Sequence, residues 1–80
     1  MNVLFFGIAK DIVGSSQITF SDEFKKPNSV AALKAQLMLS YPELSKLTSL
    51  AVAVNSEYAE DDVSLTVGDE IAIIPPVSGG

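Results

Sequence analysis

The first third of the chain carries two short runs of apolar and β-branched residues with a polar stretch between them. Residues 3–8 are rich in the residue types that favour strands, and residues 17–20 return to that character after Gly14-Ser15-Ser16. Two such runs predict a first hairpin. Its connection, residues 9–14, is longer than a tight turn and contains two apolar residues, which predicts a helical turn tucked under the sheet.

The middle of the chain changes to a helical period. Apolar residues recur at the spacing of one helix face at Val30, Leu33 and Leu37. We expect this helix to begin after Ser29, because its hydroxyl can accept a hydrogen bond from a free amide of the first turn. Pro42 ends the helix, since the residue before a proline is pushed out of the α region. Residues 43–47 then predict a short helical turn.

The second half of the chain holds two strand-length apolar runs with turns between them. Residues 50–54 form a nearly unbroken apolar run, which indicates a strand covered on both faces. Asn55-Ser56 predicts a turn, and the acidic stretch 57–63 predicts an irregular or edge segment. A turn at residues 67–70 leads into a last strand at residues 71–74.

The elements therefore follow the order strand, strand, helix, strand, short element, strand. A helix clasped by a mixed sheet in that order is the β-grasp arrangement of ubiquitin, an α+β fold. In this arrangement the first and last strands are parallel neighbours at the centre, with antiparallel partners outside them. We expect one β-grasp domain, residues 1–74, followed by an extended and flexible C-terminal tail, residues 75–80.

Composition excludes several classes of function. The chain contains neither Cys nor His, so it offers no disulfide, no thiolate nucleophile and none of the usual zinc, copper or iron ligands. The commonest general base at neutral pH is absent as well. We therefore predict a chain that is not an enzyme on its own and that holds no metal or cofactor.

Charge and hydropathy narrow the expected partners. A net charge of −5 with only five basic residues gives no positive patch for a phosphate backbone, so nucleic acid is not an expected partner. No uncharged apolar stretch approaches the roughly 20 residues that span a bilayer, so we expect a cytoplasmic protein with no membrane segment. The lysines are expected on the solvated surface: Lys10, Lys25, Lys26, Lys34 and Lys46. Asp69 is expected to support its turn, and Tyr41 and Tyr58 to serve in packing.

The chain ends in Pro75-Pro76-Val77-Ser78-Gly79-Gly80, directly beyond the last predicted strand. The prolines stiffen the base of this arm, and glycines at its tip have no Cβ, so they can enter a channel only as wide as a backbone. A frayed terminus or a linker would also be rich in Gly and Ser. Against that alternative, Pro75-Pro76-Val77 is too stiff and apolar for a flexible spacer.

The terminal carboxylate of Gly80 is the candidate reactive group. It is ionised at neutral pH and is a poor electrophile, so it needs activation from outside. Adenylation makes such a group an acyl donor, and a sulfur source can then convert it to a thiocarboxylate. This chemistry asks for no acid, base or metal from the carrier, which fits a chain without His or Cys.

The sequence resembles the sulfur-carrier small subunit of molybdopterin synthase, a ubiquitin-like family. The resemblance is carried by Val3-Leu4-Phe5-Phe6, Val13-Gly14, Ala53-Val54-Asn55, Gly68-Asp69-Glu70-Ile71-Ala72 and the ending from Pro75 to Gly80. A Gly-Gly ending alone also fits ubiquitin or the thiamin sulfur carrier. The complete ending, Pro-Pro-Val-Ser-Gly-Gly, is similar to the molybdopterin branch.

This resemblance implies a cycle with three partners in molybdenum cofactor biosynthesis. An E1-like adenylyltransferase would use ATP and Mg²⁺ to adenylate Gly80, and a sulfurtransferase or cysteine desulfurase system would then form the thiocarboxylate. The large subunit of molybdopterin synthase would accept the tail. There two sulfurs, one per carrier, would become the dithiolene of molybdopterin, made from precursor Z (cyclic pyranopterin monophosphate), in a heterotetramer with two carriers.

The strand alternation also indicates a docking surface. Val3 and Phe5 are expected to face the helix, which places Phe6 on the opposite face. Phe6 and Ile74, beside the tail, are candidates for docking to the activating enzyme and the large subunit. The alternative is that they fill a second small core under residues 57–66.

Other functions remain open from the sequence. A carrier for the thiamin pathway or another thiolation route would use the same chemistry. A ubiquitin-like modifier would instead be joined through Gly80 to protein lysines, and a β-grasp adaptor would only bind partners through its sheet.

Overall fold

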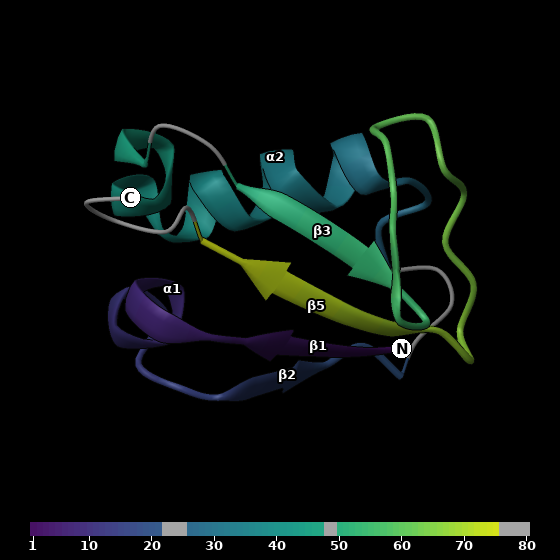
Figure 1. Cartoon of the computed structure of the whole chain (residues 1–80), viewed down its shortest axis with the longest axis horizontal. Helices are drawn as coiled ribbons and strands as arrows, with labels where there is room; N and C mark the ends of the chain where they lie inside the picture. Colours follow the sequence, from purple (N-terminus) through teal and green to yellow (C-terminus); the bar gives the residue numbers. More distant parts are fainter. Residues whose placement is uncertain (22–25, 48–49, 76–80) are drawn as a thin grey trace.

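The computed structural model describes residues 1–21, 26–47 and 50–75. These residues form a five-stranded sheet in the order β2-β1-β5-β3-β4, with the helix α2 (Val30–Ser40) packed along one face (Figure 1). The strands are β1 (Asn2–Phe5), β2 (Gln17–Thr19), β3 (Ala51–Val54), β4 (Glu57–Tyr58) and β5 (Glu70–Ile74). β1 and β5 are parallel, while the pairs β1–β2, β3–β5 and β3–β4 are antiparallel. The predicted β-grasp fold is therefore confirmed.

One core holds the sheet and the helices together. Val3 and Phe5 face α2 and are buried, as the alternation predicted. Their neighbours in this core are Val52, Ile71 and Ile73 from the sheet and Ala9, Val30, Leu33, Leu37 and Leu44 from the helical segments. Each fully buried Val, Leu, Ile or Phe side chain contributes about 1.5–3 kcal/mol relative to an exposed one, so this cluster is a main source of the stability of the fold.

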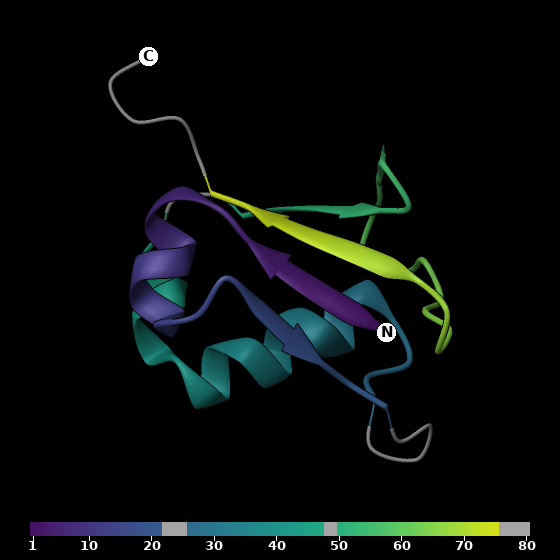
Figure 2. The same ribbon diagram turned by 90° about the horizontal axis from the view of Figure 1, so that it is seen from below.

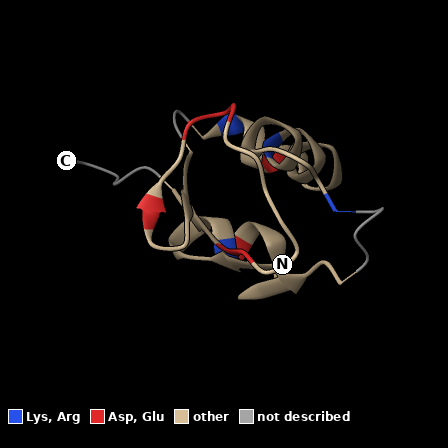
Figure 3. Cartoon of the chain, turned by 90° about the vertical axis from the view of Figure 1, so that its right-hand side faces the viewer, with Lys and Arg blue, Asp and Glu red and all other residues tan. Residues whose placement is uncertain are grey.

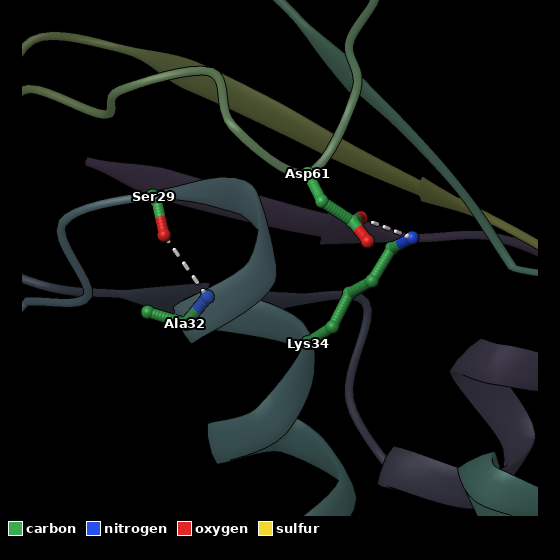
Figure 4. Close-up of polar contacts among 4 residues, drawn as sticks. All are labelled: Ser29, Ala32, Lys34 and Asp61. Atoms are coloured by element: carbon green, nitrogen blue, oxygen red, sulfur yellow. Dashed lines mark hydrogen bonds and ion pairs between the residues drawn. The ribbon is translucent and has the colours of Figure 1, made fainter.

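The boundaries of α2 agree with the sequence pattern. The Oγ of Ser29 accepts a hydrogen bond from the backbone amide of Ala32 at 3.1 Å, which confirms the predicted N-cap (Figure 4). The helix ends at Ser40, directly before Tyr41-Pro42. A 3₁₀ helix, η1 (Pro42–Lys46), follows it and provides the short helical turn that the sequence predicted.

The first strand is shorter than predicted. β1 ends at Phe5, and a seven-residue helix, α1 (Gly7–Val13), begins inside the expected strand. The same helix contains the helical turn that was predicted within residues 9–14. The physical reason lies at Gly7, whose φ of +56° is in the left-handed region and turns the chain out of the sheet. A glycine inside an apolar run was the only local signal of this break.

Two expectations about single side chains were wrong. Lys26 is 9% exposed rather than solvated, because its Nζ donates a hydrogen bond to the backbone carbonyl of Leu65 at 2.9 Å while its aliphatic stem is buried. Tyr58 is 78% exposed, because it lies on the two-residue edge strand β4. Tyr41 packs against the core as expected, and Lys10 and Lys46 are exposed. Lys25 lies outside the described residues.

The charged residues are unevenly placed along the sheet. Asp and Glu gather on the loop after β4 and around the start of β5, the side of the molecule seen in Figure 3. There Lys34 of α2 donates to Asp61 at 2.9 Å (Figure 4). β5 runs from this acidic end to the opposite end, where Ile74 and Pro75 lie (Figure 1). No helix within the described ranges is long and apolar enough to cross a membrane.

Candidate functional site

The base of the C-terminal arm lies at the centre of one end of the sheet. β5 ends at Ile74, and Pro75, which has no amide hydrogen to donate to a ladder, follows it directly. Because β5 lies between β1 and β3, the chain leaves the sheet from an inner strand (Figure 2). The predicted site residues Pro76, Val77, Ser78, Gly79 and Gly80 lie outside the described residues.

The turn from β1 into α1 lies beside this base. Parallel pairing places Phe5 opposite Ile73, so the residues that follow each strand are neighbours. A Cβ built on Gly7 would lie 3.2 Å from Cγ of Pro75, which shows how closely the proline ring approaches Gly7. The turn at Gly7 and the end of β5 therefore meet at the base of the arm.

The outer face of the sheet, on the side away from α2, is apolar next to this base. The register places the short side chains of Ala51 and Ala53 opposite Ile74 and Ala72, and Leu4 lies beside Ala72 on the other side. No helix of the described chain packs on this face. The sequence predicted that β3 is covered on both faces, and the inward-facing Val52 and the outward-facing Ala53 are both buried, while Ala51 and Val54 are half-buried.

Both predicted docking residues lie at the edge of this outer face. Phe6 has extended backbone angles and follows the inward-facing Phe5, so it points to the outer side, and it is 49% exposed. Ile74 is half-buried. The alternative of a second core under residues 57–66 is wrong, because that segment runs to the start of α2, where the amide of Val30 donates to the carbonyl of Val63 at 3.0 Å.

Two open grooves differ in their relation to the arm. A groove of about 350 Å³ adjoins the arm's base and is lined by Leu4, Phe5, Phe6, Gly7, Lys10 and Ser16. A larger one of about 460 Å³ lies at the acidic end, with Lys34, Ala59, Glu60, Asp61 and Asp62 around it. The larger groove is the less relevant one, because it lies at the opposite end of the sheet from Pro75.

The turn before β5 is fixed by a small polar network that the sequence only partly indicated. Asp69 accepts hydrogen bonds from the amide of Thr66 at 2.8 Å and from the side-chain amide of Asn55 at 2.9 Å, which confirms that it supports its turn. These hydrogen bonds hold the pKa of the Asp69 carboxyl below its usual value, and the bond from the Thr66 amide has the larger effect. Asn55 in turn accepts from the amide of Glu70 at 3.0 Å.

The sequence pattern predicted that Asn55 lies in a turn, but it did not indicate the hydrogen bonds of Asn55 to Asp69 and Glu70. Its φ of +51° is one that Asn adopts more readily than most residues, and this fits the choice of Asn at the end of β3. The network thus joins the end of β3 to the start of β5, the strand that carries the arm. Within the described chain no group of three acidic side chains is close enough to hold a metal ion.

Comparisons with known proteins agree with this geometry. A model of the ThiS family matches residues 3–80. The molybdopterin synthase sulfur carrier subunit of Aedes aegypti is 37% identical over 89 residues, covering 100% of this chain and 88% of that protein. The subunit of the same name from Arabidopsis thaliana is 36% identical over 83 residues, covering 100% and 82%.

A solved structure shows the same fold. The crystal structure of SAMP1 from Haloferax volcanii superimposes with a TM-score of 0.76 at 27% sequence identity, covering 100% of this chain and 98% of that one. The chain therefore belongs to the ThiS family and resembles molybdopterin synthase sulfur carrier subunits over its whole length.

Proposed function

We propose that this chain is the sulfur carrier subunit of a molybdopterin synthase and that the terminal carboxylate of Gly80 carries the sulfur. The observation that carries the proposal is the full-length similarity to subunits of that name, together with a family match that extends through Gly80. The geometry supports it, because Pro75 starts the arm at the end of an inner strand, next to an apolar face with the exposed Phe6 at its edge.

The chemistry divides between the carrier and its partners. An oxygen of the Gly80 carboxylate attacks the α-phosphorus of MgATP on an E1-like adenylyltransferase, releasing pyrophosphate and leaving an acyl adenylate. The terminal sulfur of a persulfide on a sulfurtransferase or cysteine desulfurase system then attacks the acyl carbon and displaces AMP, which gives an acyl disulfide. A second thiol of that system cleaves the S–S bond, which releases the thiocarboxylate and leaves a disulfide on the donor. After sulfur transfer to precursor Z on the large subunit, cleavage of the acyl C–S bond by water returns the carboxylate.

The fold supplies reach and a place to dock. The five residues after Pro75 span about 17 Å when fully extended, enough to carry the carboxylate into a partner's active site. The apolar outer face with Phe6 and Ile74 is the surface we assign to both the adenylyltransferase and the large subunit. A partner held on this face receives the arm directly, because the arm starts at its edge.

The test is the intact mass of the protein after incubation with its adenylyltransferase, MgATP and a sulfur donor. We expect a gain equal to sulfur replacing oxygen, localised to Gly80 by fragmentation. Deleting Gly80 moves the carboxylate back by about 3.5 Å, outside the tolerance of positioned chemistry, and should abolish the gain while leaving the melting temperature nearly unchanged. A deletion variant that is fully loaded with sulfur would refute the proposal.

SAMP1 of Haloferax volcanii is the small archaeal modifier protein 1. The likeness to it, at 27% identity over the whole chain, favours one second candidate function, that of a ubiquitin-like protein modifier. A modifier would form an amide bond between Gly80 and lysine side chains of other proteins. Mass spectrometry of cell extracts separates the two functions, since a modifier yields carrier–lysine adducts and a dedicated carrier is found free or as its thiocarboxylate.

A further inference from the structure

Gly7 and Pro75 make a close contact at the base of the arm. Gly7 lies where the chain leaves β1 for α1, beside the end of β5 (Figure 2). A Cβ built on Gly7 would lie 3.2 Å from Cγ and 4.0 Å from Cδ of Pro75. Carbon atoms are at their optimal separation at about 3.5–4.0 Å, so the proline ring occupies the space that a side chain at position 7 would need.

The strand before Pro75 is held firmly. Ile73 is fully buried and is paired with Phe5 on one side and Val52 on the other. Ile74 is still paired with Ala51. Rotation about ψ of Ile74 swings the ring of Pro75, and the Cγ of that ring lies 3.2 Å from the position that a Cβ on Gly7 would occupy. Because the ring itself fixes φ of Pro75 near −65°, little freedom is left at the base of the arm.

We propose that Gly7 is a positioning residue for the C-terminal arm. Because Gly7 has no Cβ, it leaves space for the ring of Pro75. This space, which we call the seat, sets the direction in which the arm leaves the sheet. The inference rests on the proposed function, because direction matters only if Gly80 must reach a partner's active site while the outer face is docked.

Small changes at the seat become large ones at the tip. A methyl group at position 7 forces the ring of Pro75 to yield by a few tenths of an ångström. If the conformation of the arm itself is unchanged, a rotation of about 10° at the base displaces the tip of an arm of roughly 17 Å by about 3 Å. Misplacement of a reacting group by about 1 Å can already cost about 100-fold in rate. A seat that favours the productive direction therefore raises the fraction of docked carriers that can react.

The chain offers a matched control at the other end of α1. Gly14 also has a left-handed φ, +80°, but a Cβ built on it meets nothing within 4 Å. Gly7→Ala and Gly14→Ala therefore introduce a comparable backbone strain, and only Gly7→Ala adds a clash with Pro75. We expect both variants to lower the melting temperature, and only Gly7→Ala to lower kcat for thiocarboxylate formation, by about tenfold, with KM for the carrier little changed.

A second substitution separates positioning from stability. Pro75→Ala removes the ring atoms that the new methyl would meet, so Gly7→Ala should have little further effect on kcat in that background. A merely structural role for Gly7 predicts instead the same loss in both backgrounds. The proposal is overturned if Gly7→Ala matches Gly14→Ala in kcat, or if its effect persists undiminished with Pro75→Ala.

A measurement of the arm's direction does not depend on the proposed function. The chain has no cysteine, so spin labels can be attached to Ser78→Cys and Leu39→Cys alone. Gly7→Ala should shift the distribution of distances between the labels by several ångströms, and Gly14→Ala should leave it unchanged. An unchanged distribution in both refutes the seat, whereas failure of the wild-type chain to accept sulfur refutes the proposed function and leaves the seat standing.

Discussion

Lys26 donates a hydrogen bond from its Nζ to the backbone carbonyl of Leu65 at 2.9 Å, joining residues 39 positions apart in the sequence. The same Nζ donates to the side-chain oxygen of Asn28 at 3.4 Å, and the amide of Leu65 donates to the backbone carbonyl of Asn28 at 2.9 Å. Lys26 therefore ties the segment before α2 to the buried Leu65, on the approach to β5.

Replacing Lys26 by Met tests this connection. Met keeps a long apolar side chain for packing and removes the ammonium group, so the carbonyl of Leu65 loses a charged donor. We expect Lys26→Met to lower the free energy of unfolding by about 2 kcal/mol, the scale of hydrogen bonds to charged groups, as measured by urea denaturation.

Lys34→Met is the control for Lys26→Met. Lys34 also makes a 2.9 Å contact, with Asp61, but the two side chains are 27% and 65% exposed. Exposed ion pairs typically contribute less than about 1 kcal/mol, so the control should have a small effect. Equal losses in the two variants would show that the buried hydrogen bond adds nothing of its own.

The fold could be predicted where the signal was local. The helical spacing of Val30, Leu33 and Leu37, the cap at Ser29 and the proline after Tyr41 place α2 correctly, because each of these acts within one or two helix turns. The parallel centre of the sheet followed from the order of the elements. The position of Phe6 and Ile74 beside the base of the arm could be predicted as well, since parallel neighbours in the sheet bring the ends of the first and last strands together. Their role in docking stays a prediction.

The errors concern residues whose environment is set by distant parts of the chain. Nothing near Lys26 indicates that the carbonyl of Leu65 lies within reach of its ammonium group. Gly7 and Pro75 are close in space but 68 positions apart in the sequence, so no local pattern indicates their contact. The apolar run at residues 3–8 therefore predicted a strand that extends past Gly7, whereas β1 ends at Phe5. The exposure of Tyr58 depends on β4 being an edge strand with no further partner in the described sheet.

Asp69 gives the fold a defined pH dependence. Hydrogen bonds from Thr66 and Asn55 hold its folded-state pKa below the ordinary value of 3.8. The unfolded chain therefore binds the proton more readily, and the stability that Asp69 provides is complete above 3.8 and is lost as the pH falls through the folded-state pKa. Asp69→Asn should cost about 1 kcal/mol at about pH 7 and progressively less towards about pH 2.5.

Urea denaturation at several pH values measures this dependence. The control is Asp62→Asn, which removes one negative charge from an exposed position at the same acidic end. It should change the free energy of unfolding at neutral pH by less than about 0.5 kcal/mol. A difference between wild type and Asp69→Asn that stays constant down to the lowest pH would contradict the assigned role of the two hydrogen bonds.

Phe6 provides the sharpest test of the outer face as a docking surface. Phe6→Glu places a charge where an apolar side chain is 49% exposed, and it leaves intact the backbone carbonyl of residue 6, which accepts from Ala9 and Lys10 in α1. The fold should therefore remain stable. Against an apolar partner surface we expect Kd for the large subunit to rise about 30-fold, the effect of losing a contact worth about 2 kcal/mol.

The same substitution at Leu39 shows whether the effect belongs to the outer face. Leu39 is an apolar residue of α2 that is 84% exposed, and α2 lies on the other face of the sheet. Leu39→Glu adds the same charge to an already acidic chain and should leave Kd within about twofold of wild type, because it lies away from the docking surface. Calorimetry with the large subunit measures both variants, and melting temperatures confirm that both are folded. If the two substitutions weaken binding equally, the loss comes from net charge, and the outer face is not the docking surface.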